Sequence, residues 1–187
     1  MSFAWDEMPR ISGERVRLRP LVETDVPALY AVFSDPDVMR YWSSPPLESV
    51  AAARALLDDI HAHFARKTLF QWGIVRADDD LVIGTTTIFQ IDPDHRRAEI
   101  GFALGREHRG RGYASDAVTS LIRFAFDTLD LHRLEADPDP QNAASIAVLK
   151  KQGFKREGFL RERYFLSGKP QDAEYYGLLR REWTKGR

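Results

Sequence analysis

The sequence of 187 residues has no cysteine and no long apolar run. Without cysteine the chain can form no disulfide, no thiolate metal site and no acyl-enzyme on sulfur. No apolar stretch approaches the ~18 residues of a membrane-spanning helix, and the N-terminal residues lack the pattern of a signal peptide. We therefore expect a cytoplasmic protein that has no membrane partner.

An excess of charge of one sign is also missing, because 27 basic residues balance 28 acidic ones and leave a net charge of −1. Interspersed charges give no general attraction for nucleic acid, and only the basic C-terminus points to such a partner. The histidines lack the spacing of metal ligands. We expect neither a nucleic-acid partner nor a metal; the histidines concerned are His61, His63, His95, His108 and His132.

What the sequence does have is apolar material, 43% of its residues, which is enough for one substantial core. Two independent domains would each be small in a chain of this length. No repeat, low-complexity tract or linker composition divides it. We predict an N-terminal extension over residues 1–13 and a single domain over residues 14–187.

The hydrophobic pattern predicts strands and helices in an α/β chain. Residues 15–19 alternate like a strand that Pro20 ends, and Thr24 is expected to cap a helix that runs to about Phe33. A second helix follows residues 44–46. The later expected elements are an antiparallel meander over 69–76, 81–91 and 97–104, a helix from about Tyr113, a short strand at 134–136, a helix from Asn142 to Gly153, and a hairpin over 154–166 and 172–179.

Residues 109–116, Arg-Gly-Arg-Gly-Tyr-Ala-Ser-Asp, join the strand expected at 97–104 to the helix that follows. Glycines there let backbone N–H groups approach a ligand, and the positive end of a helix dipole favours phosphate. A dinucleotide fold would need a third glycine where Ser115 stands, and a nucleotide P-loop would need Gly-Lys-Ser/Thr, which the sequence lacks. The loop predicts a pyrophosphate site of another kind.

This loop resembles the acyl-CoA signature Arg/Gln-x-x-Gly-x-Gly/Ala of the GCN5-related N-acetyltransferases, which residues 109–114 match at every specified position. The later run of Asn142 and Ser145, with Leu149, Lys150, Gly153 and Phe154, is similar to the RimJ/RimL-like acetyltransferases that act on the N-termini of ribosomal proteins. The resemblance covers about residues 15–183. It implies an α/β fold of the α+β type, with a single mixed, mostly antiparallel sheet of about seven strands and about four flanking helices.

The resemblance also implies that acetyl-CoA is the acetyl donor. Backbone N–H groups of residues 109–114 would hold its pyrophosphate, and Arg109 and Arg111 would add charge, although a solvated surface loop also explains these arginines. The pantetheine arm would run along residues 102–104, where one main-chain N–H stabilises the oxyanion. The implied cofactor-binding residues are Phe102, Ala103, Leu104, Arg109, Gly110, Arg111, Gly112, Tyr113, Ala114, Asn142 and Ser145.

Glu99 is the leading candidate for a general base. On a strand it shares one face with Gly101 and Ala103, whose small size leaves room for a ligand beside the carboxylate. The alternative is a surface glutamate that pairs with Arg96 or Arg97. One base supplies about 3 to 5 kcal/mol of catalysis, whereas positioning of both reactants supplies roughly 7 to 11 kcal/mol.

Asn142 and Ser145 have an ordinary explanation as the cap and third position of a helix start. The resemblance implies in addition that the asparagine contacts the pantetheine and that the serine lies near the sulfur. Many relatives place a tyrosine general acid seven residues after that asparagine, where this chain has Leu149. Ser145 is therefore the candidate acid, and a thiol with a pKa near ~8.5 needs little help to leave.

Tyr41 and Trp42 are candidate substrate contacts together with Glu99, because the loop between the first two helices usually borders the acceptor cleft in this family. An α-amine with a pKa of ~7.7 to 8.0 is roughly one-tenth neutral at pH 7, and a lysine amine near ~10.4 is far less so. This difference and the resemblance favour direct transfer of acetyl to a protein or peptide N-terminus.

Other functions stay open at this point. The acceptor can be a small-molecule amine such as an amino acid, a polyamine or an aminoglycoside. Leu149 in place of tyrosine keeps open a noncatalytic acyl-CoA-binding regulatory module. The sequence does not decide between a monomer and a homodimer.

Overall fold

The computed structural model of the chain describes residues 6–42, 44–166 and 168–184. These residues form one eight-stranded sheet in the order β1-β2-β3-β4-β5-β6-β8-β7, in which only β5 and β6 are parallel neighbours. The strands are β1 (Ile11–Ser12), β2 (Val16–Arg19), β3 (Leu69–Arg76), β4 (Val82–Asp92), β5 (Arg97–Leu104), β6 (Arg133–Ala136), β7 (Lys155–Leu166) and β8 (Lys169–Leu179). The helices are α1 (Val26–Phe33), α2 (Pro36–Met39), α3 (Val50–Ala65), α4 (Tyr113–Asp127) and α5 (Ala143–Gln152).

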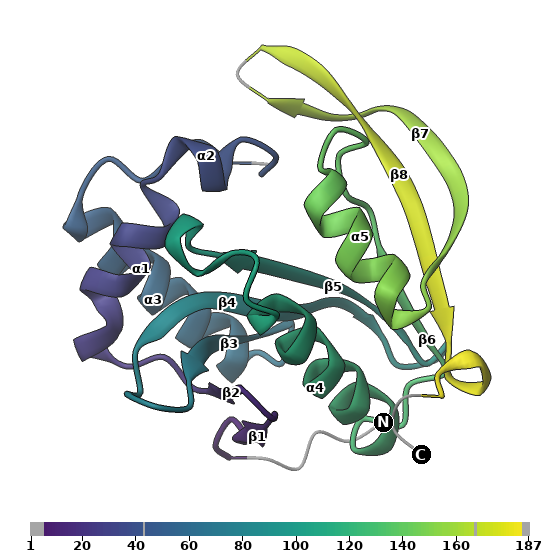
Figure 1. Cartoon of the computed structure of the whole chain (residues 1–187), viewed down its shortest axis with the longest axis horizontal. Coiled ribbons are helices and arrows are strands. Elements are labelled where there is room, and N and C mark those ends of the chain that lie inside the picture. The colour runs from purple at the N-terminus through teal and green to yellow at the C-terminus, as the bar shows by residue number, and fades with distance from the viewer. Residues whose placement is uncertain (1–5, 43, 167, 185–187) are drawn as a thin grey trace.

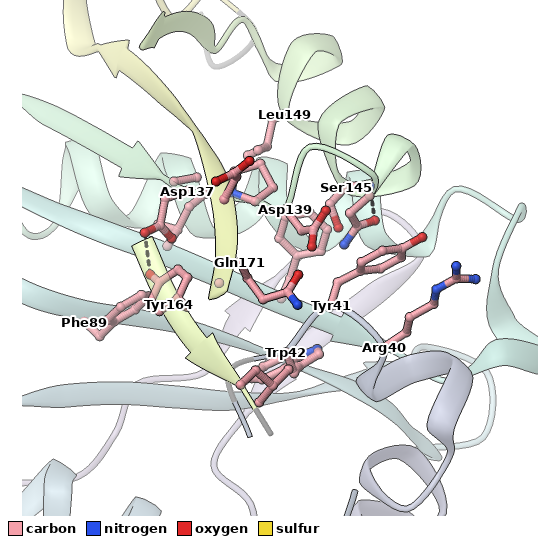
Figure 2. A pocket seen from close by; sticks show the side chains of 18 of the residues that line it. Arg40, Tyr41, Trp42, Phe89, Asp137, Asp139, Ser145, Leu149, Tyr164 and Gln171 are labelled. Atoms are coloured by element: carbon pink, nitrogen blue, oxygen red, sulfur yellow. Dashed lines mark hydrogen bonds between the residues drawn. The ribbon is translucent and has the colours of Figure 1, made fainter. Parts of the chain in front are cut away.

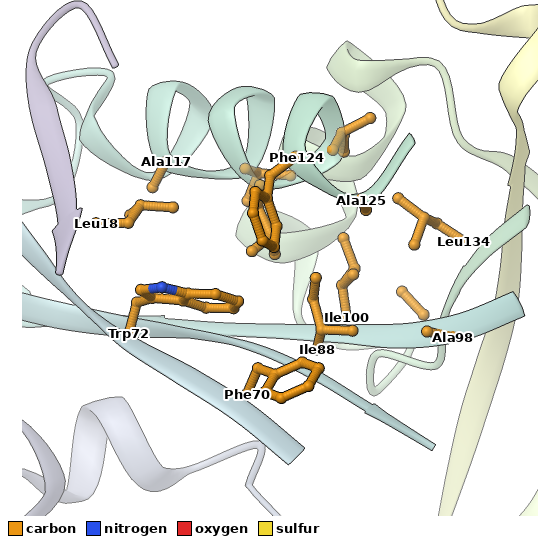
Figure 3. Close-up of a cluster of buried hydrophobic side chains, with 14 of the residues drawn as sticks. Leu18, Phe70, Trp72, Ile88, Ala98, Ile100, Ala117, Phe124, Ala125 and Leu134 are labelled. Carbon is orange, nitrogen blue, oxygen red and sulfur yellow. The ribbon is translucent and has the colours of Figure 1, made fainter. Parts of the chain in front are cut away.

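Helices cover both faces of the sheet, so strands in its centre are buried on both sides (Figure 1). On one face α4 packs Ala117, Leu121 and Phe124 against Trp72 and Ile100, as Figure 3 shows in part. On the other face α1 and α3 form a second apolar cluster against β3 and β4. The amphipathic pattern of α4 explains this arrangement, because its apolar residues recur at three- and four-residue steps.

The feature that shapes the site is a wedge between β5 and β6. The two strands pair only from Arg97–Arg133 to Glu99–Glu135. Strand β6 then ends at Ala136, before Pro138, whereas β5 continues to Leu104. Because Pro138 has no N–H for a sheet ladder, the strands part there and leave one edge of β5 without a neighbouring strand.

The predicted mixed, mostly antiparallel α/β fold is confirmed, and the numbers of elements differ slightly from the expected counts of about seven strands and about four helices. The described residues contain eight strands and five α-helices. The additional elements are β1, with two residues, and α2, with four. Segments so short carry no readable periodicity, because the helical repeat alone takes ~3.6 residues.

The first helix also begins later than expected. Thr24 lies in a 3₁₀ turn over Glu23–Asp25, and Asp25 is the N-cap residue of α1. Pro27 in the first turn of α1 suits this start, because its fixed φ is that of a helix. Asp25 is buried in an ion pair with Arg19 (2.7 Å), which fixes the turn against β2.

The segment expected as an N-terminal extension lies only partly within the described residues, since residues 1–5 fall outside them. In the remaining part, Met8 is buried in the core beneath α4. Trp72 Nε1 donates a hydrogen bond to the carbonyl oxygen of Pro9 (2.8 Å). Residues 11 and 12 then pair with β2, so residues 8–12 pack onto the sheet.

Candidate active site

The glycine loop ends at the N-terminus of α4 in a conformation that glycine makes possible. Gly110 and Gly112 have φ angles of 76° and 82°, and Gly112 is the N-cap residue of the helix. A Cβ added at Gly110 would meet nothing within 4 Å, so the backbone there borders open space. Free N–H groups and the helix dipole meet at this point, which makes it a fitting place for a diphosphate.

The two arginines of the loop lie differently. Arg109 lines the cleft, and its guanidinium donates to the carbonyl oxygens of Leu104 (3.4 Å) and Asp37 (3.4 Å). These bonds tie the loop to the end of β5 and to α2. Arg111 is exposed and is not among the residues that line the cleft, although its carbonyl oxygen accepts a hydrogen bond from Arg15 (3.5 Å).

A cleft of about 590 Å³ runs from this loop along the open edge of β5. One wall is the strand segment predicted to bind the pantetheine, and the facing wall is α5 with the residues before it. Thr86 Oγ1 on β4 donates to the Gly101 carbonyl oxygen (3.2 Å). Since backbone groups alternate between the two edges of a strand, the N–H and C=O of Phe102 face the wedge. The lining residues predicted from the sequence are Phe102, Ala103, Leu104, Arg109, Gly110, Gly112, Tyr113, Ala114, Asn142 and Ser145.

A buried glutamine fixes the spacing between the two helices of this cleft. Gln152, at the end of α5 and 2% exposed, donates through Nε2 to the Ser115 carbonyl oxygen (3.1 Å) and to Ser115 Oγ (2.9 Å). Thr119 Oγ1 lies 3.0 Å from Gln152 Oε1. The first turn of α4 is thereby held to α5.

A second pocket of about 310 Å³ continues from the cleft into the mouth of the wedge (Figure 2). The two hollows share the lining residues Tyr41, Trp42, Phe102, Asn142 and Ser145, so they meet at the place where the sequence predicts the thioester. The predicted substrate contacts Tyr41 and Trp42 thus lie at the junction. Charged groups of the outer pocket are Arg40, Asp137, Asp139 and Asp172.

Glu99 lies at the vertex of the wedge and is only 3% exposed. Its Oε2 is buried and has no hydrogen-bond partner among the described residues. Burial raises the pKa of Glu99 to about 7, and the negative charges of Asp137 and Glu135 add to the effect. This carboxyl is therefore half-ionised near neutral pH, which suits a general base.

The alternative role of Glu99 as a surface ion-pair partner is wrong. Arg97 pairs with Glu135 (3.0 Å) and Asp92 (3.2 Å) instead. Arg96 pairs with Asp130 (2.8 Å). Both arginines thus have other carboxylate partners, and Glu99 forms no salt bridge with any described residue.

The start of α5 places the candidate acid at the junction of the hollows. Asn142 is the N-cap residue, and its Oδ1 accepts a hydrogen bond from the Ser145 N–H (3.1 Å). Ser145 is half-buried and lines both hollows. Leu149, one turn later, is 1% exposed and also lines the outer pocket. The position at which the resemblance implies a tyrosine general acid thus lines the outer pocket but carries no hydroxyl.

Sequence reasoning assigned no role to Asp137 and Tyr164, which are among the residues that line the outer pocket. Tyr164 Oη donates a hydrogen bond to Asp137 Oδ2, as the dashed line in Figure 2 shows. A signal for Asp137 existed, since it directly follows the short strand expected at 134–136 next to a strand that carries Glu99. No local pattern marks Tyr164, which long-range pairing of β7 brings to the site.

The described residues lack two further features. They contain no group of three histidine, aspartate or glutamate side chains placed to hold a metal ion. None of the helices in the described ranges has the length and apolar character needed to cross a membrane.

Comparison with known proteins gives consistent matches over most of the chain. The model of the acetyltransferase (GNAT) domain matches residues 15–155. An uncharacterized N-acetyltransferase p20 of Bacillus licheniformis is 36% identical over 177 residues, which cover 95% of this chain and 99% of that protein. The spermidine N(1)-acetyltransferase of Escherichia coli K12 is 30% identical over 87% of this chain and 84% of its own. A structure of RimL, a ribosomal L7/L12 alpha-N-protein acetyltransferase, has a TM-score of 0.82 at 22% identity and covers 91% of this chain and 94% of its own, which shows a shared fold.

Proposed function

The chain belongs to the acetyltransferase (GNAT) family of acetyl-CoA-dependent N-acetyltransferases, and we propose that its acceptor is the α-amine at the N-terminus of a protein or peptide. The cleft fits the donor, because a glycine loop with open space at Gly110 meets a helix N-terminus. Acetyl-CoA supplies an acetyl group activated as a thioester. The protein's part is to hold both reactants and to accept a proton.

The observation that carries the proposal is the buried carboxyl of Glu99 with a pKa of about 7. An α-amine has a pKa of ~7.7 to 8.0, so giving its proton to this carboxylate costs only about 1 kcal/mol. A lysine-type amine near ~10.4 requires about 4 to 5 kcal/mol for the same step. The base is therefore matched to an α-amine.

The surroundings of the pocket support a chain-like acceptor. The outer pocket shares Asp139, Gln171 and Asp172 with a further hollow of about 360 Å³. That hollow lies along β7 and β8, the long hairpin that curves past α5 in Figure 1. Residues that follow the reacting amine of a peptide have room there.

The remaining roles follow from position. Backbone N–H groups of residues 109–114 hold the pyrophosphate of the donor, and the Phe102 N–H polarises the thioester carbonyl. Ser145 lies where it can donate to the departing sulfur. Tyr41 and Trp42 cover the reacting groups at the junction and limit access of water.

A polyamine is the second candidate acceptor. The outer pocket has three aspartates and one arginine among its charged lining residues, which favours a polycation. The similarity to a spermidine N(1)-acetyltransferase points the same way. A polyamine nitrogen must still lose a proton with a high pKa, and that step is the reason for ranking it second.

The test is competition between amines for a limited amount of acetyl-CoA. A peptide with a free N-terminus and one internal lysine, the same peptide with a blocked N-terminus, and spermidine are each incubated with the protein. Mass spectrometry with fragmentation locates the acetyl group. Acetylation at the free N-terminus alone supports the proposal, whereas a product confined to spermidine or to the lysine overturns it.

A further inference from the structure

A bulge in β7 aims two side chains at the mouth of the wedge. The pairing of β7 with β8 passes from Leu160–Ala173 to Tyr164–Gln171, so β7 has extra residues between them. Glu162 in this bulge has a φ of 52°, and its N–H donates to Asp172 Oδ1 (2.8 Å). Bulges redirect side chains beside active sites, and this one turns Arg163 and Tyr164 toward Asp137.

Asp137 is held by one of its two oxygens. Oδ2 accepts the hydrogen bond of Tyr164 and lies 3.5 Å from Arg163 Nε. The side chain of Asp137 is 12% exposed. Its other oxygen, Oδ1, accepts no hydrogen bond from any described residue. A carboxylate fixed on one side and open on the other is prepared to bind a donor.

The open side belongs to the outer pocket, whose lining includes Asp137, Tyr164, Gly101 and Ser145. Glu99 lies close enough to sense the charge of Asp137, and its own Oε2 is buried without a partner. The pocket lining therefore includes an anchored carboxylate, Asp137, whereas Glu99 lies at the vertex of the wedge and is not itself among the lining residues.

We propose that Asp137, anchored by Tyr164, binds the acceptor amine in its ammonium form and presents it to Glu99, which makes it a specificity-determining residue for cationic primary amines. The inference rests on the proposed acetyl transfer and deepens it. Asp137 then accepts a hydrogen bond from the ammonium at the pocket lining, a second N–H is directed toward the vertex of the wedge where Glu99 lies, and the nitrogen is left facing the junction where Ser145 lies.

The proton and electron balance of the step is complete with these groups. The ammonium gives one proton to the Glu99 carboxylate, and its nitrogen pair forms the bond to the acetyl carbon. The carbon–sulfur bond breaks and its electron pair leaves with sulfur. A second proton passes from nitrogen to the thiolate, the third stays on the amide, and Glu99 releases its proton to solvent.

Several charged groups near Glu99 influence its pKa and therefore the pH dependence of activity that we expect. Strand β6 and the residue after it contribute Glu135 and Asp137, and both raise the pKa of Glu99. Arg163 on β7 and Arg97 on its own strand lower it, and the neutral phenol of Tyr164 donates its hydrogen bond to Asp137. Removal of the Asp137 charge must therefore lower the pKa of Glu99.

The experiment compares Asp137→Asn with the wild-type protein and with Asp59→Asn, which removes a charge from the exposed face of α3. We expect the KM for the amine to rise about 10- to 100-fold, the range for losing a hydrogen bond to a charged group, with little change in kcat. The acidic limb of kcat/KM against pH should move to lower pH. Affinity for acetyl-CoA, measured by calorimetry, should not change.

Tyr164→Phe is the second variant, because it keeps the ring and removes only the anchor of Asp137. It should raise the same KM by a smaller factor, and it decides the matter if Asp137→Asn does not fold. An unchanged KM with an unmoved pH limb overturns the role of Asp137 while acetyl transfer by the wild type stands. A wild type that acetylates no amine overturns the proposed function itself.

Discussion

The cleft proposed to bind the donor (the donor cleft) and the outer pocket proposed to bind the acceptor (the acceptor pocket) adjoin at one wedge, yet they are built from different parts of the chain. The donor cleft uses backbone: the glycines of residues 109–114 and the open edge of β5. The acceptor pocket uses side chains from α2 and its following loop, β5, β6 and β7. A backbone site can be encoded in one short segment, whereas a side-chain site needs several parts of the chain to arrive together.

The two hollows also differ in the electrostatic cost of keeping their functional groups ready for a ligand. N–H groups at a helix start are neutral, so keeping them unpaired in the absence of a ligand costs little free energy. The acceptor side instead keeps a carboxyl, Glu99, in a place where burial opposes its charge. The rate of acetyl transfer should therefore depend most on the side chains of the acceptor pocket, and the affinity for acetyl-CoA on the backbone of the donor cleft.

The largest effect is expected from Glu99→Gln. The change removes the proton acceptor but keeps the shape, so kcat/KM at neutral pH should fall about 10²- to 10⁴-fold. Activity of the wild type should rise with pH through about 7, where Glu99 loses its proton, and the variant should lack this limb. Steady-state rates of thiol release between pH 5.5 and 9 measure both.

The control for this prediction is Glu48→Gln, a change at an exposed position before α3. It should leave the rates and the pH profile as they are. Acetyl-CoA affinity should be equal in all three proteins, because Glu99 does not line the donor cleft. A variant at position 99 with full activity and an intact pH limb would transfer the role of base to another group.

The same substitution should stabilise the protein at alkaline pH. A carboxyl whose pKa is higher in the folded state than in the unfolded chain binds more protons when folded, so the free energy of unfolding falls as pH rises. For Glu99 this loss runs from about pH 4.5 to 7 and amounts to about 3 kcal/mol. Urea denaturation should show Glu99→Gln gaining on the wild type between pH 5 and pH 8, and an advantage that does not grow with pH would contradict a buried, titrating Glu99.

Most residues that the resemblance implies for donor binding line a single cleft, because a site made from backbone is encoded in a short segment. Of the implied cofactor-binding residues, only Arg111 does not line the cleft. The glycine spacing, the strand before it and the helix after it are local features, and Asn142 marks its helix start by the chemistry of an N-cap. Each of these sequence patterns lies within a few residues of the structural element that it predicts.

The acceptor half was predictable only in part. Tyr41, Trp42 and Glu99 were named, but the burial of Glu99 depends on the three-pair contact between β5 and β6, and nothing in its neighbours along the chain reports that contact. The sequence offered Arg96 and Arg97 as partners because they are near in number. Asp137 and Tyr164 come together because of a bulge in β7. The alternation of apolar and polar residues along a strand does not reveal such a shift of register.

The smallest effect, and the sharpest test of a backbone-built donor site, comes from a matched pair of glycines. Gly110 and Gly168 have φ angles of 76° and 77°, and an added Cβ meets nothing within 4 Å at either. Alanine at each position should cost about 1 kcal/mol of stability through the left-handed backbone alone. Only Gly110→Ala should also weaken acetyl-CoA binding, by about tenfold in Kd, because the strained loop turns its N–H groups away from the diphosphate. Equal losses of affinity in the two variants, measured by calorimetry, would mean that the donor is held elsewhere than at the glycine loop.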